Sequence, residues 1–146
     1  MVGKALQWAR TYYPQDKFYH ACRVAEFVME NDAVPSDMKE QCYIVALLHD
    51  LLEDTDFNIE LVENAEICYY HGFIHPMSKA LLQLTHDKKK DSYEEYIAKI
   101  PKGGIAYWVK IADMKDHLTQ TATLTDKLKE KYLRGLLFFF DFIIKI

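Results

Sequence analysis

The stretch Ala46–Thr55, which reads ALLHDLLEDT, is the part of the sequence that decides the fold. From Ile44 to Leu52 every residue is apolar except His49 and Asp50. A helix that is apolar nearly all round is a buried helix, so this stretch predicts the centre of an all-α core. Desolvating an imidazole and a carboxylate there is costly unless a partner compensates them, and a divalent metal ion is such a partner.

Two further acids, Glu53 and Asp54, follow this pair by about one helical turn. Residues three and four apart share a helix face, so we expect both acids to lie on the side of Asp50. Acids near the C-terminal end of a helix oppose its dipole. Their unfavourable placement favours a functional role over that of a solvated helix end.

Composition indicates one globular domain spanning residues 1–146, because half of the residues are hydrophobic and 14% are aromatic. The net charge of -4 argues against a nucleic-acid partner. Three cysteines without paired spacing are typical of reduced thiols, so we expect a cytoplasmic protein. No signal pattern is seen, and the apolar run 136–140 is far shorter than the roughly 20 residues of a membrane span, so we expect no membrane association.

The whole chain is predicted to be helical, since alternating apolar patterns are scarce and few glycines and prolines interrupt it. Ser92 and Glu95 have the spacing of a capping box, which predicts a helix start at that point. The last helix is expected to pack on the others. The predicted helices cover residues 5–13, 17–30, 37–53, 59–72, 75–85, 92–100, 105–118 and 125–146.

Two more polar residues, His20 and Asp113, are embedded in apolar helical sequence. Taken alone, His20 is more often a structural histidine than a metal ligand, and Asp113 is equally consistent with a buried hydrogen-bonded residue and with a ligand. Together with His49 and Asp50 they make a set of two imidazoles and two carboxylates from three helices. Mixed nitrogen and oxygen donors favour a borderline or hard divalent ion, Mn²⁺ in the first place, or Fe²⁺, Zn²⁺ or Mg²⁺.

The order His20, His49–Asp50, Asp113 resembles the H…HD…D pattern of the HD-domain metal-dependent phosphohydrolases. Residues 47–55 resemble the LLHDxxEDT segment of the RelA/SpoT-type (p)ppGpp hydrolase domains and their small single-domain relatives. Residues 109–113 are similar to the VKLAD segment of that group, and the stretch that begins at His20 is similar to its HPxxVA segment.

This resemblance covers roughly residues 5–118 and implies an all-α HD domain with one metal ion. In the alarmone hydrolases the two acids after the HD pair are implicated in handling the nucleophilic water, a role that falls here on Glu53 and Asp54. The chemistry agrees, because a metal lowers the pKa of bound water and a nearby carboxylate accepts its proton. The implied metal ligands are His20, His49, Asp50 and Asp113.

Two lysines, Lys17 and Lys88, are the candidate substrate-binding residues. The segment 13–18 is shorter than the guanine-binding loop of the alarmone hydrolases and has no glycine, so guanine recognition stays open. Lys88 lies in a Thr-x-Asp-Lys stretch like the one near the substrate phosphates of related small hydrolases, with a solvated lysine run as the alternative. The second HD dipeptide, His86–Asp87, lies in a charged loop where we expect neither an apolar environment nor a role. His117 replaces the usual Asn of the family, and its role stays open.

The leading functional hypothesis is a metal-dependent phosphohydrolase acting on a small nucleotide-like phosphate ester. Hydrolysis of a (p)ppGpp-type alarmone is the nearest family analogy. The alternatives are a phosphatase for nucleoside monophosphates or other metabolites, and a catalytically silent nucleotide-binding HD module. Tyr93 and Tyr96 are either core residues, the more frequent case, or stacking surfaces for a base. The sequence does not specify the oligomeric state.

Overall fold

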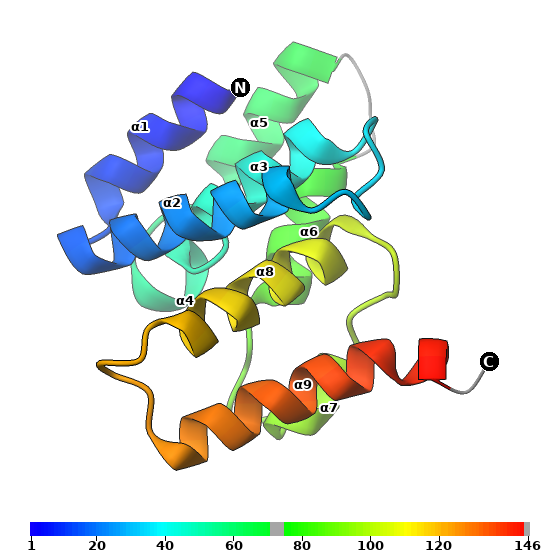
Figure 1. Cartoon of the computed structure of the whole chain (residues 1–146). Helices are drawn as coiled ribbons and strands as arrows, with labels where there is room; N and C mark the ends of the chain where they lie inside the picture. The colour runs from blue at the N-terminus through cyan, green and yellow to red at the C-terminus, as the bar shows by residue number, and fades with distance from the viewer. Residues whose placement is uncertain (71–74, 145–146) are drawn as a thin grey trace.

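The computed structural model describes residues 1–70 and 75–144, and within these ranges it contains helices and no strand, which confirms the all-α prediction. Figure 1 shows the arrangement of the helices. No helix in these ranges is long and apolar enough to cross a membrane. The helices are α1 (Val2–Tyr12), α2 (Gln15–Glu30), α3 (Lys39–Leu48), α4 (Leu51–Asp54), α5 (Glu60–Tyr70), α6 (Pro76–Leu84), α7 (Tyr93–Ala98), α8 (Ile105–Thr119) and α9 (Asp126–Ile144).

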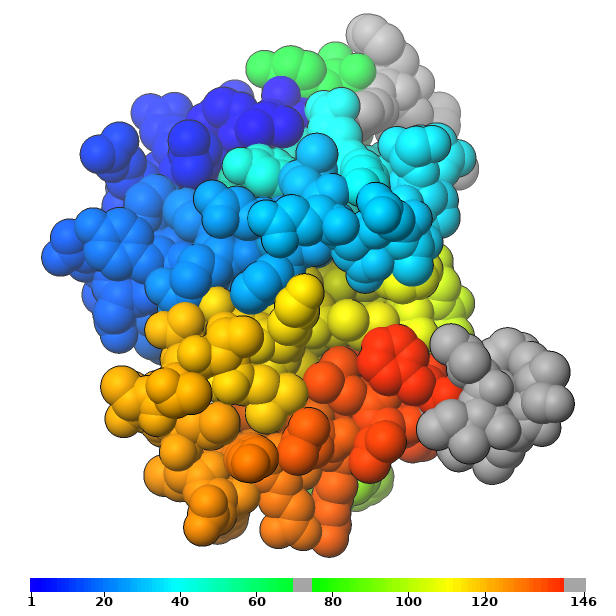
Figure 2. All heavy atoms as spheres, in the orientation of Figure 1, coloured from blue at the N-terminus to red at the C-terminus, as the bar shows by residue number. Residues whose placement is uncertain are grey.

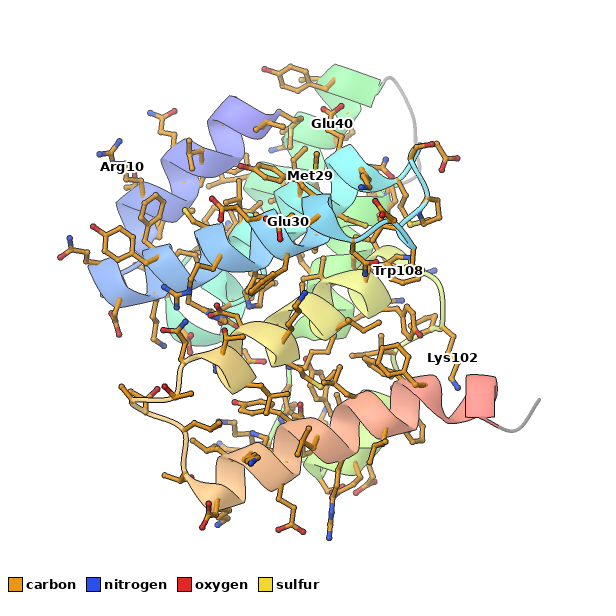
Figure 3. The ribbon with its side chains drawn as sticks, in the orientation of Figure 1. Arg10, Met29, Glu30, Glu40, Lys102 and Trp108 are labelled. Carbon is orange, nitrogen blue, oxygen red and sulfur yellow. The ribbon has the colours of Figure 1, made fainter. Side chains whose placement is uncertain are left out.

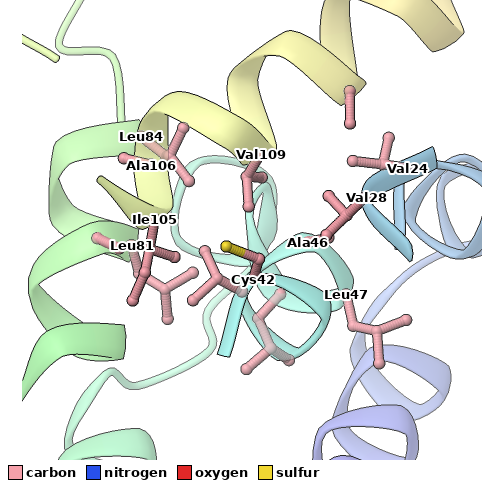
Figure 4. Packing of buried hydrophobic residues seen from close by; sticks show 14 of the residues in the cluster. Val24, Val28, Cys42, Ala46, Leu47, Leu81, Leu84, Ile105, Ala106 and Val109 are labelled. Carbon is pink, nitrogen blue, oxygen red and sulfur yellow. The ribbon is translucent and has the colours of Figure 1, made fainter. Parts of the chain in front are cut away.

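Helix α3 is the centre of the core and packs against α1, α2, α6 and α8. In Figure 4, Cys42 and Ala46 of α3 lie among Val28 of α2, Leu81 of α6 and Val109 of α8, and all five side chains are buried. Full burial of one aliphatic side chain contributes about 1.5–3 kcal/mol, so this layer supplies much of the stability. A polar side chain at the end of α3 is therefore surrounded by apolar packing.

The predicted continuous helix over 37–53 is wrong at one point, because it breaks between Leu48 and Leu51. In a regular helix the amide of Asp50 would donate to the carbonyl of Ala46. Instead, Nδ1 of His49 donates to that carbonyl at 2.7 Å, and the Asp50 amide donates to the hydroxyl of Tyr13 at 2.9 Å. The break lets His49 and Asp50 approach the same point, although adjacent residues of a regular helix diverge by about 100°.

The other helix boundaries lie within a few residues of those predicted. The capping box at the start of α7 is confirmed: Ser92 Oγ accepts the Glu95 amide, and Glu95 Oε1 accepts the Ser92 amide. The expected end of α5 at residue 72 and the last two residues of the predicted C-terminal helix lie outside the described ranges. Sequence signals that act within a few residues therefore predict where these helices begin and end.

A buried carboxylate fixes the start of α6 against α5. Glu66 is 1% exposed and accepts the amides of Met77 and Ser78 at 3.1 and 2.8 Å, and the Ser78 hydroxyl at 2.5 Å. The first amides of a helix lack partners within the helix, and an anion placed there satisfies them. Glu66 thus has a complete structural explanation.

Helices α2, α8 and α9 lie one after another across the face seen in Figure 1, and Figure 2 shows their side chains as consecutive bands. Met29 of α2, labelled in Figure 3, is 46% exposed. Gly135 permits the close approach of α9 to α8, because a Cβ there would lie 2.6 Å from Met114 Sδ. Helix α8 therefore packs against both α2 and α9.

Candidate metal centre

Four polar side chains predicted from the sequence come together where α2, α3 and α8 pack against one another. Their potential ligand atoms all lie within 4.8 Å of one another, which confirms that they form one group. Helix α2 supplies the first residue, the break after α3 supplies two, and α8 supplies the fourth. The group consists of His20, His49, Asp50 and Asp113.

The oxygen Oδ1 of Asp113 is the central atom of this group. It lies 2.9 Å from Nε2 of His20 and 3.2 Å from Nε2 of His49. The oxygen Oδ2 of Asp50 lies 3.2 Å from Nε2 of His49 and 3.7 Å from Nε2 of His20. Two imidazole nitrogens and two carboxylate oxygens therefore face the same small volume.

Both imidazoles are oriented through their other nitrogen. His49 Nδ1 contacts the carbonyl of Ala46 at 2.7 Å, and His20 Nδ1 contacts Oδ2 of Asp116 at 2.6 Å. Carbonyl and carboxylate oxygens only accept, so both Nδ1 atoms are the donors. A metal-binding histidine nearly always donates its second nitrogen to such an oxygen, which directs the first toward the ion. The four residues therefore fit a divalent cation.

Asp116 orients the His20 imidazole and is itself held by Arg23. Neither residue was predicted from the sequence to belong to the site. Asp116 is fully buried and accepts Nε and Nη2 of Arg23 at 2.8 and 3.1 Å, in addition to the His20 imidazole. A signal was present: Asp116 follows Asp113 by three residues, and Arg23 follows His20 by three. Residues at that spacing share a helix face, so each lies beside a predicted ligand.

The second oxygen of Asp113 is compensated by a lysine. Lys110 Nζ lies 2.8 Å from Asp113 Oδ2, so the two oxygens of this carboxylate have different partners. Burial by itself would raise the pKa of Asp113, but the Lys110 ammonium and the neighbouring imidazoles hold that pKa well below its usual range. Burial would lower the pKa of His49, yet Asp50 and Asp113 raise it well above its usual value. The buried Asp113 carboxylate therefore has positively charged or hydrogen-bonding partners at both of its oxygens.

A cleft of about 610 Å³ opens over this group. Its volume lies within the range of about 300–1,000 Å³ that is usual for small-molecule sites. All the residues that sequence analysis proposed for chemistry or substrate line it: the four metal-ligand candidates and Lys17, Glu53, Asp54 and Lys88.

The two acids after the HD pair have different partners at the rim of the cleft. The carboxylate of Glu53 accepts the backbone amide of His86, which ties α4 to the loop before α7. Asp54 Oδ2 forms an ion pair with Lys17 Nζ at 2.7 Å. Neither acid belongs to the four-residue group.

The expectation for the loop with the second HD dipeptide is wrong in one respect. His86 has an aromatic neighbour, because its ring stacks on Tyr96 with centroids 4.5 Å apart, and it lines the cleft. Tyr96 is a buried core residue, as the more frequent interpretation held, and its hydroxyl donates to the Leu84 carbonyl at 2.6 Å. Tyr93 is half-buried and faces the cleft.

His117 lies at the edge of the group. Its Nε2 is 3.3 Å from Asp113 Oδ1, and its ring stacks in parallel on Tyr132 with centroids 4.5 Å apart. The side chain of His117 is 38% exposed, so it connects the buried carboxylate with the open cleft.

Comparison with known proteins does not add a family to this description. No family model matches the chain, and no curated protein is significantly similar to it in sequence.

Proposed function

We propose that this chain is an HD-type metal-dependent phosphohydrolase that cleaves a phosphate ester of a small nucleotide-like substrate. One observation carries the proposal. Two imidazoles, each held by a hydrogen bond from Nδ1, direct Nε2 toward two carboxylates on the floor of a cleft of about 610 Å³. The order of these residues in the sequence resembles that of the HD family and also supports a metal-dependent phosphohydrolase.

The four-residue group would hold one divalent ion. Such an ion lowers the pKa of a water molecule bound to it and polarises a phosphoryl oxygen. Asp50 and Asp113 would supply anionic oxygens to the ion, and His20 and His49, deprotonated at Nε2, would supply nitrogens. This mixed set suits Mn²⁺ best among the candidates, with Fe²⁺, Zn²⁺ and Mg²⁺ as alternatives.

Glu53 is the proposed acceptor of the proton from the attacking water. The amide of His86 fixes one oxygen of its carboxylate, and among the described residues no hydrogen bond or ion pair involves the second. A positioned general base contributes typically about 10²–10⁴-fold to the rate. Asp54 has a different task, because its ion pair holds the Lys17 ammonium at the rim, where it can contact a phosphate.

The lysines and the family analogy define the first substrates to examine. Lys17 and Lys88 line the cleft from separate segments and offer positive charge to phosphate oxygens. The resemblance to the alarmone hydrolases puts pyrophosphate removal from (p)ppGpp-type nucleotides first. Nucleoside monophosphates and sugar phosphates come next.

The test combines metal analysis with a substrate screen. Protein purified without chelator is analysed for bound metal beside Asp50→Ala, and Asp56→Ala serves as the control because Asp56 is exposed and does not line the cleft. We expect about one equivalent of metal in the parent and the control and much less in Asp50→Ala. The Mn²⁺-loaded parent should then release phosphate or pyrophosphate from at least one nucleotide or sugar phosphate. Equal metal content in Asp50→Ala would contradict the ligand assignment, and a metal-loaded parent inactive on the whole panel would contradict the enzymatic function.

A further inference from the structure

His117 occupies a position at which this chain departs from the HD family. The family usually has an asparagine there, whereas this chain has a third imidazole beside the metal group, so the resemblance says nothing about its task. His117 follows Asp113 by four residues on α8, a spacing that puts both side chains on one face of the helix. Two side chains at that spacing can bind the same metal ion, as paired histidines do in many zinc enzymes.

The imidazole of His117 faces the same oxygen as the two histidines of the metal group. Its Nε2 lies 3.3 Å from Oδ1 of Asp113, compared with 2.9 Å for Nε2 of His20 and 3.2 Å for Nε2 of His49. A carboxylate oxygen has about two lone pairs, which two donors are enough to occupy. Hydrogen bonding to this oxygen therefore does not account for three converging imidazoles, whereas a cation beside it would give all three a partner.

Two aromatic rings hold the His117 ring in this direction. It stacks on Tyr132 with an interplanar angle of 1° and centroids 4.5 Å apart, and its centroid lies 4.7 Å from that of His20. Tyr132 is buried on α9, which Gly135 allows to approach α8 closely. The last helix therefore positions a side chain of α8 at the edge of the metal group.

His117 differs from the two histidines of the group in its freedom to move. It is not among the residues whose ligand atoms all lie within 4.8 Å of one another, so its ring has to turn toward a bound ion. Its side chain is 38% exposed and lines the cleft, which leaves space for that rotation. Among the described residues no hydrogen bond fixes its Nδ1, whereas Nδ1 of His20 and of His49 is fixed. An imidazole without such support binds a metal less tightly.

We infer that His117 is a fifth, labile ligand of the metal ion and completes a set of three imidazole nitrogens and two carboxylate oxygens. This inference rests on the metal group of the proposed function. Imidazole suits Zn²⁺ and Fe²⁺, whereas Mn²⁺ and Mg²⁺ are better served by oxygen donors and water. His117 therefore adds affinity for Zn²⁺ and Fe²⁺ and adds little for Mn²⁺, which the other four residues hold.

The first experiment follows the histidine nitrogens of the full chain, labelled with ¹⁵N, before and after Zn²⁺ is added. A ring nitrogen that binds Zn²⁺ changes its chemical shift in long-range ¹H–¹⁵N spectra. The parent should show a metal-bound nitrogen in His20, His49 and His117. The variant His117→Phe keeps an aromatic ring against Tyr132, identifies the His117 signals by their loss, and should leave the other two histidines metal-bound.

Competition titrations against a chelator measure what the fifth ligand contributes. Loss of a group that merely supports a ligand weakens metal binding by about 10- to 100-fold, so His117→Phe should lose about tenfold or more in Zn²⁺ affinity and clearly less in Mn²⁺ affinity. Thermal melting checks that the variant is folded. His117→Asn, which restores the usual residue of the family, should show the same difference between the two ions.

His86→Phe is the matched control. His86 also stacks on a tyrosine, with centroids 4.5 Å apart, and also lines the cleft. Among the described residues its ring nitrogen bonds to the Asp91 carbonyl, and no hydrogen bond or ion pair joins it to the metal group. This variant should therefore bind Zn²⁺ and Mn²⁺ as the parent does.

The outcomes separate this inference from the proposed function. Metal-bound nitrogens in His20 and His49 alone, or parental Zn²⁺ affinity in His117→Phe, would overturn the fifth ligand and keep the four-residue site. An equal loss for Zn²⁺ and Mn²⁺ would overturn the effect on metal preference. Three metal-bound histidines in a chain that hydrolyses no phosphate ester would keep the fifth ligand and refute the hydrolase. A parent in which no imidazole responds to Zn²⁺ would refute both.

Discussion

Replacing Asp116 by asparagine is the sharpest test of the support behind the metal ligands. The carboxylate of Asp116 orients His20 through Nδ1 at 2.6 Å and is itself held by Arg23. Asparagine keeps the shape, but it removes the negative charge and replaces one acceptor oxygen by an NH₂ group. Either the His20 imidazole or the Arg23 guanidinium then loses its partner.

The size of the effect follows from these contacts. Loss of such a supporting partner typically weakens metal binding by about 10- to 100-fold. That range corresponds to about 1.4–2.7 kcal/mol. It agrees with the roughly 1.5–3 kcal/mol of a single hydrogen bond to a charged group, and Asp116 makes three.

The assay is a competition titration of Mn²⁺ and Zn²⁺ against a chelator, with Glu66→Gln as the matched control. Glu66 is also a buried carboxylate with three donors, but it joins α5 to α6 and does not line the cleft. We expect Glu66→Gln to lower the free energy of unfolding by about 1–3 kcal/mol and to leave metal affinity unchanged. Asp116→Asn should change metal affinity in the folded protein. If both variants change metal affinity equally, or if neither does, the supporting role of Asp116 is refuted.

Two further outcomes are expected. A metal ion that binds only the folded chain stabilises it. Mn²⁺ at 100 times its dissociation constant should therefore raise the free energy of unfolding by about 2.7 kcal/mol, and EDTA should remove this gain. A melting temperature that changes with neither Mn²⁺ nor EDTA would contradict the metal site. Glu53→Gln should keep the metal and lose about 10²–10⁴-fold in turnover. His86→Ala should turn over substrate at nearly the parental rate, because the backbone amide that contacts Glu53 remains. Parental turnover in Glu53→Gln would refute the role of Glu53 as a base.

The fold and the four-residue group were predictable because their signals are local. Pro14, the Ser92 capping box and the apolar periodicity each act within a few residues, and the helices begin and end near them. His49 and Asp113 stood out because a polar residue in apolar sequence requires a partner.

What the sequence did not reveal depends on contacts between distant segments. The break after Leu48 requires the hydroxyl of Tyr13, which lies 37 residues before the amide that donates to it. The stack of His86 on Tyr96 requires the loop before α7 to fold back over that helix. Neither arrangement follows from periodicity, since each is set by which helices become neighbours.

The contact between Tyr13 and Asp50 extends the functional unit beyond the residues that bear the chemistry. Helix α1 supplies no ligand, yet the tyrosine directly after it accepts the amide whose release from the helix brings Asp50 toward His49. A shortened chain that began just before His20 would retain every ligand candidate and would leave the Asp50 amide without its acceptor. The smallest piece able to assemble this site therefore includes the residues up to Tyr13, and we expect Tyr13→Phe to destabilise the break after α3 because it removes the acceptor of the Asp50 amide.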